Sequence, residues 1–361
     1  MSDFTLTLHP AADGDALLLA WGPESDRHHA LIDLGRQGNG RALLPRLAAI
    51  GRLDLFVVTH VDADHIAGAM PLVDDAAAPF AVDEVWFNGR EQLVEAVHRR
   101  APREILGALQ GERFTDGVTR FGWPRNTRFA SRIVSRDSPE AATPIAFPGG
   151  LTLRLLSPTD ARLAALLPDW DAEIAAAALR AGEKVAAEPE ALPSGREPFA
   201  GAPDVDALAA EPFRTDRTSA NGSSIAFLAE YAGRRVLFGA DAHPDVLVEA
   251  IAPLAAAEGG RLRVDCFKVS HHGSRANTSP QLLALLDCTR FLYSTDGSRH
   301  GHPDPQAIAR VLVADRRRPK RLCFNFRRPK TEMWDVTSLK KAWHYDCVFP
   351  AGDGDPLVVE I

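Results

Sequence analysis

Cysteines are scarce in this chain of 361 residues, and none of the four forms a CxxC pair. Their positions do not outline the paired-cysteine spacing of a structural zinc site or a redox site. Three of them lie in apolar, strand-like runs, so we expect them to be buried as small apolar side chains. The four are Cys266, Cys288, Cys323 and Cys347.

Long apolar runs are also missing. No stretch approaches the roughly 18 uninterrupted apolar residues of a membrane-spanning helix. The sequence MSDFTLTL at the start contains neither the basic segment nor the apolar core of a secretory signal. We therefore expect a cytoplasmic protein with no membrane partner.

The formal net charge is −7, which argues against a surface coated with cations for bulk nucleic-acid binding. Eight cations nevertheless gather within residues 316–330. They are interpreted either as a solvated helix end followed by a strand, or as an electrostatic funnel for a polyanion. In the second case Arg316, Arg317 and Arg318 bind the substrate. The apolar residues 322–326 inside the cluster are expected at an edge of a sheet.

The length and the hydrophobic content of 45% allow a large core. Short strand-like runs alternate with helical segments in two blocks. This pattern predicts an α/β fold with two mixed sheets packed face to face under outer helices, the αββα sandwich. We expect one domain, residues 1–361, with two insertions. The first is a partly ordered excursion at residues 111–145, and the second, at 159–218, is a helix followed by a stretch rich in Pro, Glu, Ala and Gly.

The segment THVDADHIAG, which follows an apolar, strand-like run, contains four candidate metal ligands within six positions. The side chains of His60, Asp62, Asp64 and His65 would repel one another or lose hydrogen bonds if left alone. At the end of a buried strand they can converge on cations instead. A simpler alternative is that Asp62 or Asp64 caps the following helix. Capping needs only one carboxylate, so the metal site is favoured.

Two further apolar runs end in residues of the same kinds. VLFGAD ends in Asp241, and FKVSHHGS contains the adjacent His271 and His272. A GHP segment with His302 follows. Seven of the twelve histidines lie at or just after strand-like runs, which a scattered population of surface histidines would not do.

Together these motifs resemble the metallo-β-lactamase hydrolase superfamily, and more closely the soluble hydrolase domain of the ComEC family of DNA-uptake channel proteins. The matching segments are DGDALLL at 13–19, LIDLG at 31–35, HVDADHIAG at 60–68, NGSSIAFL at 221–228, VLFGAD at 236–241, FKVSHHGS at 267–274 and GHP at 301–303. The resemblance implies a metallo-β-lactamase fold acting on phosphodiesters, with DNA degradation as the family's proposed activity. This sequence departs from the family by Asp62, where the superfamily usually has histidine, by lacking the membrane channel, and by its long insertions.

Two divalent cations, Mn²⁺, Zn²⁺ or Mg²⁺, are therefore expected. Such a pair lowers the pKa of a bound water, so that hydroxide is available near neutral pH, and it clamps the attacked and leaving oxygens. The expected ligands are His60 and Asp62 for the first cation, Asp64, His65 and His302 for the second, and Asp241 as the bridge.

The first cation is then short of a nitrogen ligand. The only histidine between His65 and Asp241 is His98, which lies in an amphipathic helical segment and is expected to face solvent. Asn221, Ser224, His271 or water could complete the ligand set. An oxygen-rich set shifts the preference from Zn²⁺ toward Mn²⁺ or Mg²⁺.

Other residues are expected to act around the cations. Adjacent residues of an extended chain point to opposite sides, so one of His271 and His272 is expected to face the site, as a ligand or as the general acid. Asp33 either orients a ligand histidine or is a surface-turn residue. The expected catalytic residues are Asp64, His271, His272 and Lys268, the last to neutralise phosphate charge, while Gly273 and Ser274 offer donors to a phosphate.

The leading hypothesis is a metal-dependent phosphodiesterase that cleaves nucleic acid, DNA first of all. A second hypothesis is hydrolysis of a small cyclic or linear nucleotide, a thioester or a lactam at the same site. The third belongs to another class: an effector subunit of a multi-protein complex, for example in defence against foreign DNA. In that case the insertions and the basic residues 316–330 would bind a protein partner.

Overall fold

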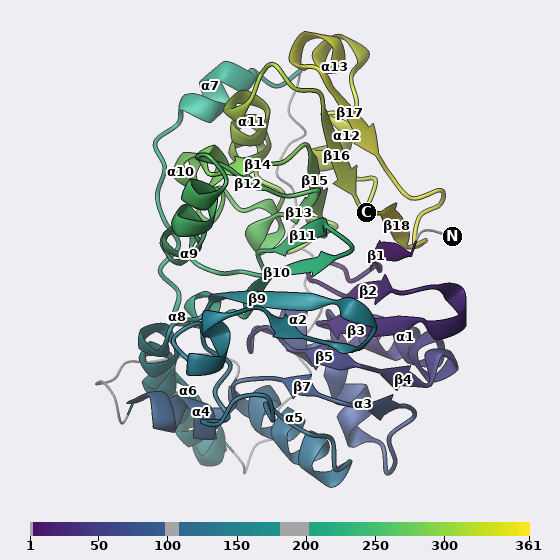
Figure 1. Cartoon of the computed structure of the whole chain (residues 1–361), viewed down its shortest axis with the longest axis vertical. Helices are drawn as coiled ribbons and strands as arrows, with labels where there is room; N and C mark the ends of the chain where they lie inside the picture. The colour runs from purple at the N-terminus through teal and green to yellow at the C-terminus, as the bar shows by residue number, and fades with distance from the viewer. Residues whose placement is uncertain (1–2, 98–107, 181–201) are drawn as a thin grey trace.

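Two β-sheets lie face to face between two layers of helices in the computed structural model of the chain (Figure 1). The structure describes residues 3–97, 108–180 and 202–361. The predicted αββα sandwich is thereby confirmed. Among the described residues, no helix is both long enough and apolar enough to cross a membrane.

The first sheet has the strand order β18-β1-β2-β3-β5-β7. Strands β1, β2 and β3 are antiparallel neighbours, whereas β3, β5 and β7 run parallel. The start of β2 therefore lies at the same edge as the ends of β3, β5 and β7. The strands are β1 (Phe4–Leu8), β2 (Leu17–Trp21), β3 (His28–Ile32), β5 (Leu55–Val57), β7 (Val85–Trp86) and β18 (Leu357–Glu360).

The second sheet has the order β17-β16-β15-β13-β11-β10-β9-β8, and its strands from β11 to β17 are parallel neighbours. The strand formed by residues 320–324, β16, was predicted at an edge. It is instead an inner strand, because β17 pairs with it on the outer side. The strands are β8 (Ile145–Ala146), β9 (Thr152–Ser157), β10 (Ala226–Tyr231), β11 (Arg234–Phe238), β13 (Cys266–Lys268), β15 (Arg290–Tyr293), β16 (Lys320–Phe324) and β17 (Tyr345–Val348).

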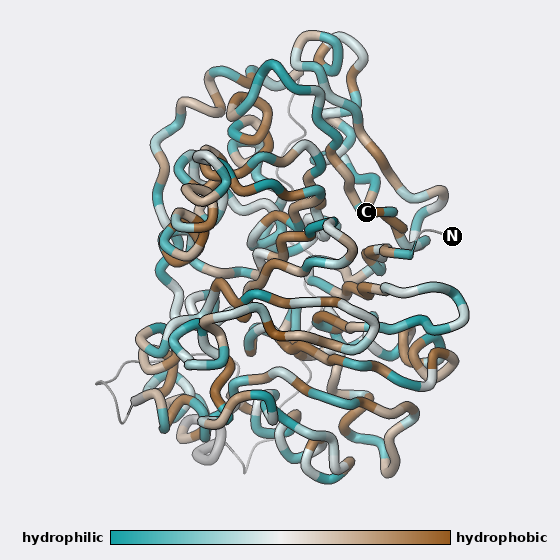
Figure 2. Tube along the Cα trace, in the orientation of Figure 1, coloured by the Kyte–Doolittle hydropathy of each residue, from teal (hydrophilic) through white to brown (hydrophobic). Residues whose placement is uncertain are grey.

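Apolar side chains from both sheets form the central core. Leu6 and Trp86 of the first sheet share one buried cluster with Phe227, Phe238 and Leu292 of the second. Figure 2 shows the apolar character of the strands between the helix layers. Two short pairs supplement the sheets: β4 (Arg52–Leu53) with β6 (Ala81–Val82), and β12 (Leu262–Arg263) with β14 (Leu286–Asp287).

Each sheet has its own helix layer, and each layer has its own buried cluster. The first sheet is covered by α1 (Gln37–Ile50), α3 (Met70–Asp74), α4 (Arg90–Val97), α5 (Ala108–Arg120) and α6 (Asp160–Arg180). The second is covered by α7 (Val205–Ala210), α9 (Pro244–Ala257), α10 (Pro280–Ala284), α11 (Pro305–Ala314) and α13 (Thr337–Trp343). Three short helices lie in loops: α2 (Ala63–Ile66), α8 (Ser219–Gly222) and α12 (Pro329–Glu332).

The excursion predicted at residues 111–145 is in large part ordered structure. It contains most of α5, whose Phe114 and Val118 are buried in the first helix layer. This helix was not predicted from the sequence because it contains two glycines, Gly111 and Gly117, and glycine disfavours a helix interior. They are required by packing: a Cβ at Gly111 would lie 2.2 Å from Trp170, and one at Gly117 would lie 2.3 Å from Val73. Both insertions stay predictions, and residues 181–201 of the second lie outside the described residues.

Gly117→Ala is expected to destabilise the fold by about 1–3 kcal/mol, because the added methyl group overlaps Val73 in a packed layer. The measurement is urea unfolding. Gly38→Ala in α1 is the matched control, since nothing lies within 4 Å of a Cβ at that exposed helical position. The control should be neutral or slightly stabilising. Equal losses in the two variants would show that α5 is not packed as described.

Candidate metal centre

The polar residues singled out in the sequence gather at one edge of the two-sheet sandwich. The reason is topological, because the ends of the parallel strands and the start of β2 meet there. The loop before β2 contributes Asp15, the ends of β3 and β5 lead to Asp33 and His60, and the ends of β11 and β13 lead to Asp241 and the two adjacent histidines.

The loop after β5 does not use its carboxylates to cap a helix. Asp62 stands at the N-cap position of α2, but its side chain makes no capping hydrogen bond. It lies 3.5 Å from Nε2 of His60 instead. Asp64 and His65 follow within α2 and are both buried. Helix capping by a carboxylate of this loop therefore does not account for the loop's geometry.

Asp33 fixes the orientation of the first two histidine rings. One of its carboxylate oxygens lies 2.7 Å from Nδ1 of His65, and the same oxygen accepts a hydrogen bond of 2.7 Å from the Thr59 hydroxyl. Since that hydroxyl donates its proton to Asp33, it can only accept from Nδ1 of His60, 3.0 Å away. Both rings therefore carry a proton on Nδ1 and direct Nε2 away from Asp33. Asp33 is fully buried, so it is not a surface-turn residue.

His271 and His272 both face the centre, contrary to the expectation that only one would. The expectation assumed an extended chain, whereas both residues adopt left-handed backbone conformations, with φ of 49° and 54°. Nδ1 of His272 donates to the Ser294 carbonyl at 2.8 Å, and Nδ1 of His271 lies 3.0 Å from the Asn277 amide oxygen. Their Nε2 atoms are thus the ones directed inward.

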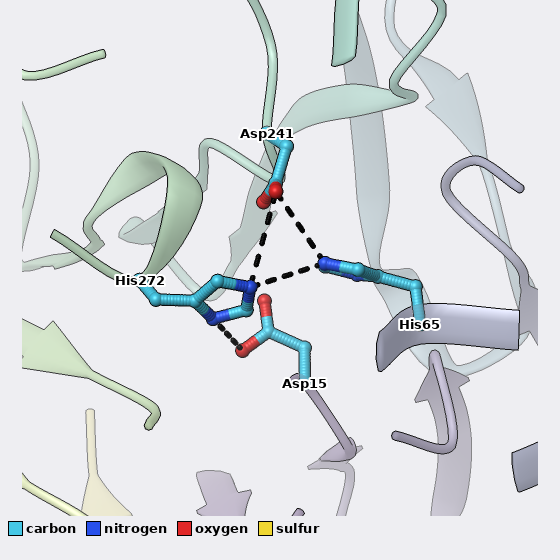
Figure 3. A group of neighbouring side chains, drawn as sticks. All are labelled: Asp15, His65, Asp241 and His272. Carbon is cyan, nitrogen blue, oxygen red and sulfur yellow. Dashed lines mark hydrogen bonds and ion pairs between the residues drawn. The ribbon is translucent and has the colours of Figure 1, made fainter. Parts of the chain in front are cut away.

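Four imidazole Nε2 atoms surround one carboxylate oxygen, Oδ2 of Asp241. The distances are 3.9 Å from His60, 3.5 Å from His65, 3.6 Å from His271 and 3.8 Å from His272. Figure 3 shows two of these rings pointing at Asp241. No hydrogen-bond partner exists among the described residues for Nε2 of His60 or for Oδ1 of Asp241, although both atoms are buried.

These separations suit cations placed between the side chains. With bonds of about 2.1 Å, two ligands of a tetrahedral cation lie roughly 3.4 Å apart. On one side of Asp241, Nε2 of His65 lies 3.2 Å from Nε2 of His272 and 4.0 Å from Asp64. Buried polar atoms without partners are costly, and a cation would satisfy them. The residues on this side of Asp241 therefore fit a cation.

The charges of the centre support one another. Burial favours neutral forms, but Asp241, Asp33 and Asp64 outweigh it and hold the pKa of His65 well above 6.5. The same competition, led by Asp241, raises the pKa of His272 to about 10. Burial also opposes the charge of Asp241, yet the neighbouring histidines hold its pKa well below the usual range. Because Nδ1 already carries a proton, further protonation occurs on Nε2, the atom that a cation would need.

Asp15 belongs to the centre, although the sequence reasoning did not select it. Ligand atoms of Asp15, His65, Asp241 and His272 all lie within 4.8 Å of one another (Figure 3). The loop that carries Asp15 touches the first motif directly, because a Cβ at Gly14 would lie 1.7 Å from the carbonyl oxygen of Asp64. The available signal was an acid directly before an apolar strand.

Lys268 was predicted to neutralise the charge of a phosphate, but its side chain is directed at Asp15 instead. Its Nζ binds Oδ2 of Asp15 at 2.6 Å, and both side chains are fully buried. The other oxygen of Asp15 lies 3.5 Å from Nδ1 of His272. Lys268 therefore compensates a buried carboxylate behind the histidine, and a phosphate could contact it only by displacing Asp15.

Asp216, another residue missed in the sequence, stands behind His271. One of its carboxylate oxygens lies 3.4 Å from Nδ1 of His271 and accepts hydrogen bonds from the side-chain amides of Asn221, at 2.6 Å, and Asn277, at 3.2 Å. Asn221 was expected beside the centre and lies there, next to Asp216. Asp216 was missed because it stands alone in a part of the sequence with little periodicity.

The remaining predicted residues lie around the centre with other partners. The ring of His302 lies 5.1 Å from that of His271, and its Nδ1 lies 3.5 Å from Asp304. The amide of Ser274 donates to the His271 carbonyl at 2.7 Å, which occupies one donor expected for phosphate. Gly273 has a φ of +85°, and a Cβ there would lie 2.8 Å from Pro303. His98 lies outside the described residues.

The basic residues 316–318 lie at the end of the second sheet opposite the metal centre, so they are not placed to guide a substrate to it. They precede β16, whereas the metal centre follows the ends of β11 and β13, which run parallel to it through β15. Two of them are also paired, Arg316 with Asp206 and Arg318 with Asp287. Since β16 has five residues, roughly 16 Å separate its two ends.

No family model matches the chain, and no curated protein matches it. Twenty-six chains of solved structures are similar to it. The fold is an αββα sandwich. Similar structures include the metallo-β-lactamase fold protein YhfI from Bacillus subtilis (11% identity, 99% of this chain and 100% of that chain, TM-score 0.42), Zn²⁺-bound PqqB from Methylobacterium extorquens (12%, 99% and 100%, 0.40) and a diphosphatase of the PhnP family (11%, 98% and 97%, 0.34).

Proposed function

We propose that this chain is a metal-dependent hydrolase of phosphodiester bonds, with DNA as the substrate that the motif resemblance favours. The observation that carries the proposal is the convergence of four Nε2 atoms on Oδ2 of Asp241. A buried group of this composition has no structural role that apolar side chains would not serve better. It is suited to holding cations.

The proposal places two cations, one on either side of Asp241. We assign His60, Asp62 and His271 to the first, and Asp64, His65 and His272 to the second, with Asp241 shared. This assignment differs from the one made from the sequence, because His271 supplies the missing nitrogen ligand and His272 takes the place of His302. When bound, a divalent pair lowers the pKa of water and offsets charge on the phosphoryl oxygens.

The residues behind the ligands hold the rings in the orientation that the cations require. Asp33 and Thr59 do so for His60 and His65, while Asp216 and Asn277 do so for His271. Such partners commonly tune metal affinity by 10–100-fold. Each cation has nitrogen and oxygen ligands in equal number, so the oxygen-rich argument for Mn²⁺ or Mg²⁺ weakens and Zn²⁺ becomes an equal candidate.

The protein reloaded with Zn²⁺ or Mn²⁺ is expected to contain close to two cations per chain. The reason is that the ligand set has four imidazoles and three carboxylates, too many for one cation. Elemental analysis after removal of loosely bound metal makes the measurement. A saturated value of one would remove the shared role of Asp241, and a value of zero would remove the proposal.

The activity is tested with a small phosphodiester, bis-p-nitrophenyl phosphate, beside labelled single-stranded DNA, duplex DNA and RNA. Turnover is expected with the metal-loaded protein and not after chelation. Cleavage of the small ester and of a cyclic nucleotide, with no cleavage of any polymer, would favour the small-nucleotide alternative.

A further inference from the structure

A groove with a volume of about 770 Å³ lies at the end of the second sheet remote from the metal centre. It is formed by the starts of β15, β16 and β17, which are parallel neighbours, together with α13. Six of its lining side chains are basic, and only one is acidic. The basic residues are Arg290, Lys320, Arg321, Lys340, Lys341 and His344.

Four of the five arginine and lysine side chains in this set have no carboxylate partner among the described residues. Arg290 donates to the backbone carbonyl of Glu360, and Lys320 donates to the carbonyls of Leu312 and Asp315. Arg321 and Lys341 are exposed, and no side-chain partner occurs for either in the described part of the chain. Carbonyl oxygens satisfy the donors but leave the positive charge uncompensated.

The one acidic side chain of the groove is already engaged. Asp346 lies 3.3 Å from Nζ of Lys340, which also binds Asp335 at 2.7 Å. In a chain of net charge −7, exposed arginines elsewhere commonly face carboxylates, as Arg52 does with Asp83 at 2.7 Å. The groove thus concentrates a positive potential that the protein does not neutralise.

Lys320, the buried cation of the groove, directs its ammonium group at the carbonyls of Leu312 and Asp315 at the end of α11. Burial lowers the pKa of Lys320, and Arg318 and Arg261 lower it further, while Asp315 opposes them. Arginine and lysine donors, with the hydroxyls of Thr289 and Thr337, are the groups that contact phosphates in proteins that bind nucleic acids.

We propose that this groove binds the phosphate backbone of single-stranded nucleic acid, as a site separate from the metal centre. Its volume is that of a pocket for several ligand groups, and a flexible strand can enter a concave site that a rigid duplex would span. The proposal rests on the proposed function only for the choice of nucleic acid among polyanions. The binding itself needs no cation and no turnover.

The test measures binding of a fluorescent oligo(dT) of about twenty nucleotides to the full chain in the presence of a chelator. Arg321→Glu/Lys341→Glu is expected to weaken binding at least about tenfold, which is about 1.4 kcal/mol. The slope of log affinity against log salt should become shallower by about 1.4, or about 0.7 for each lost phosphate contact with a single strand. Turnover of bis-p-nitrophenyl phosphate by the metal-loaded variant should not change.

The matched control is Arg41→Glu/Arg46→Glu in α1, which makes the same charge change at exposed positions of the other helix layer. It should alter binding less than about twofold. Equal losses in the two variants, or none in the groove variant, would overturn the proposal. So would poly-glutamate displacing oligo(dT) at equal charge concentration, since the groove would then be a surface for an acidic protein. If metal loading and turnover fail while groove-dependent binding persists, only the hydrolase proposal is lost.

Discussion

Asp241→Asn is expected to lower turnover of any phosphodiester substrate at least about 10³-fold, which is about 4 kcal/mol in the barrier. Oδ2 of Asp241 is the atom on which all four Nε2 atoms converge, at 3.5–3.9 Å. An amide oxygen has no negative charge, so it holds two neighbouring cations far more weakly than a carboxylate oxygen does. The metal content should fall from about two per chain to one or fewer, by elemental analysis.

Asp83→Asn is the control for this substitution, because Asp83 is a surface carboxylate paired only with Arg52 among the described residues. It makes the same chemical change and should leave metal content and turnover unaltered. Unfolding curves of both variants check that the fold survives. Two cations per chain in Asp241→Asn, with wild-type turnover, would place the chemistry elsewhere.

Lys268→Met is expected to destabilise the fold by about 3–5 kcal/mol, measured by urea unfolding in the presence of a chelator. Nζ of Lys268 lies 2.6 Å from Asp15, and both side chains are fully buried. Removing the ammonium leaves a buried carboxylate without its cation, with Nδ1 of His272 at 3.5 Å. The cost is that of an uncompensated buried charge rather than of lost packing.

The double variant Asp15→Asn/Lys268→Met distinguishes the cost of an uncompensated buried charge from the cost of lost packing. It removes both charges, so its loss should be smaller than the sum of the two single losses. The exposed pair Arg52 and Asp83, treated in the same way, should couple by no more than about 1 kcal/mol. Strict additivity for Asp15 and Lys268 would mean that the two residues do not act as a pair.

Much of the metal centre follows from one rule that can be read in the sequence: an apolar run that ends in an acid or a histidine. The rule selected Asp33, His60 and Asp241, which lie together because their strands end at one edge. It failed for Asp15, since β2 runs antiparallel to β3 and so contributes its start, not its end, to that edge. Strand direction is a property of the whole sheet and is not visible in a local segment.

Two other differences between the sequence-based predictions and the structure have local causes. The side to which His271 and His272 point depends on left-handed backbone angles that non-glycine residues seldom adopt, so residue type gave no warning. The basic residues 316–330 are contiguous in sequence, yet β16 separates them into groups at opposite ends of a sheet. Charge density along a sequence therefore does not give charge density on a surface.

The two cations would be held from both sheets at once, His60 and His65 from loops of the first and Asp241 and His272 from loops of the second. Before the two sheets pack against each other, only half of the ligands of each cation are close together. On the proposed function, metal uptake is therefore selective for the completed sandwich, and bound metal adds stability by mass action, about 2.7 kcal/mol at a free concentration one hundred times the dissociation constant. The supply of cation would then govern the lifetime of the folded protein as well as its chemistry.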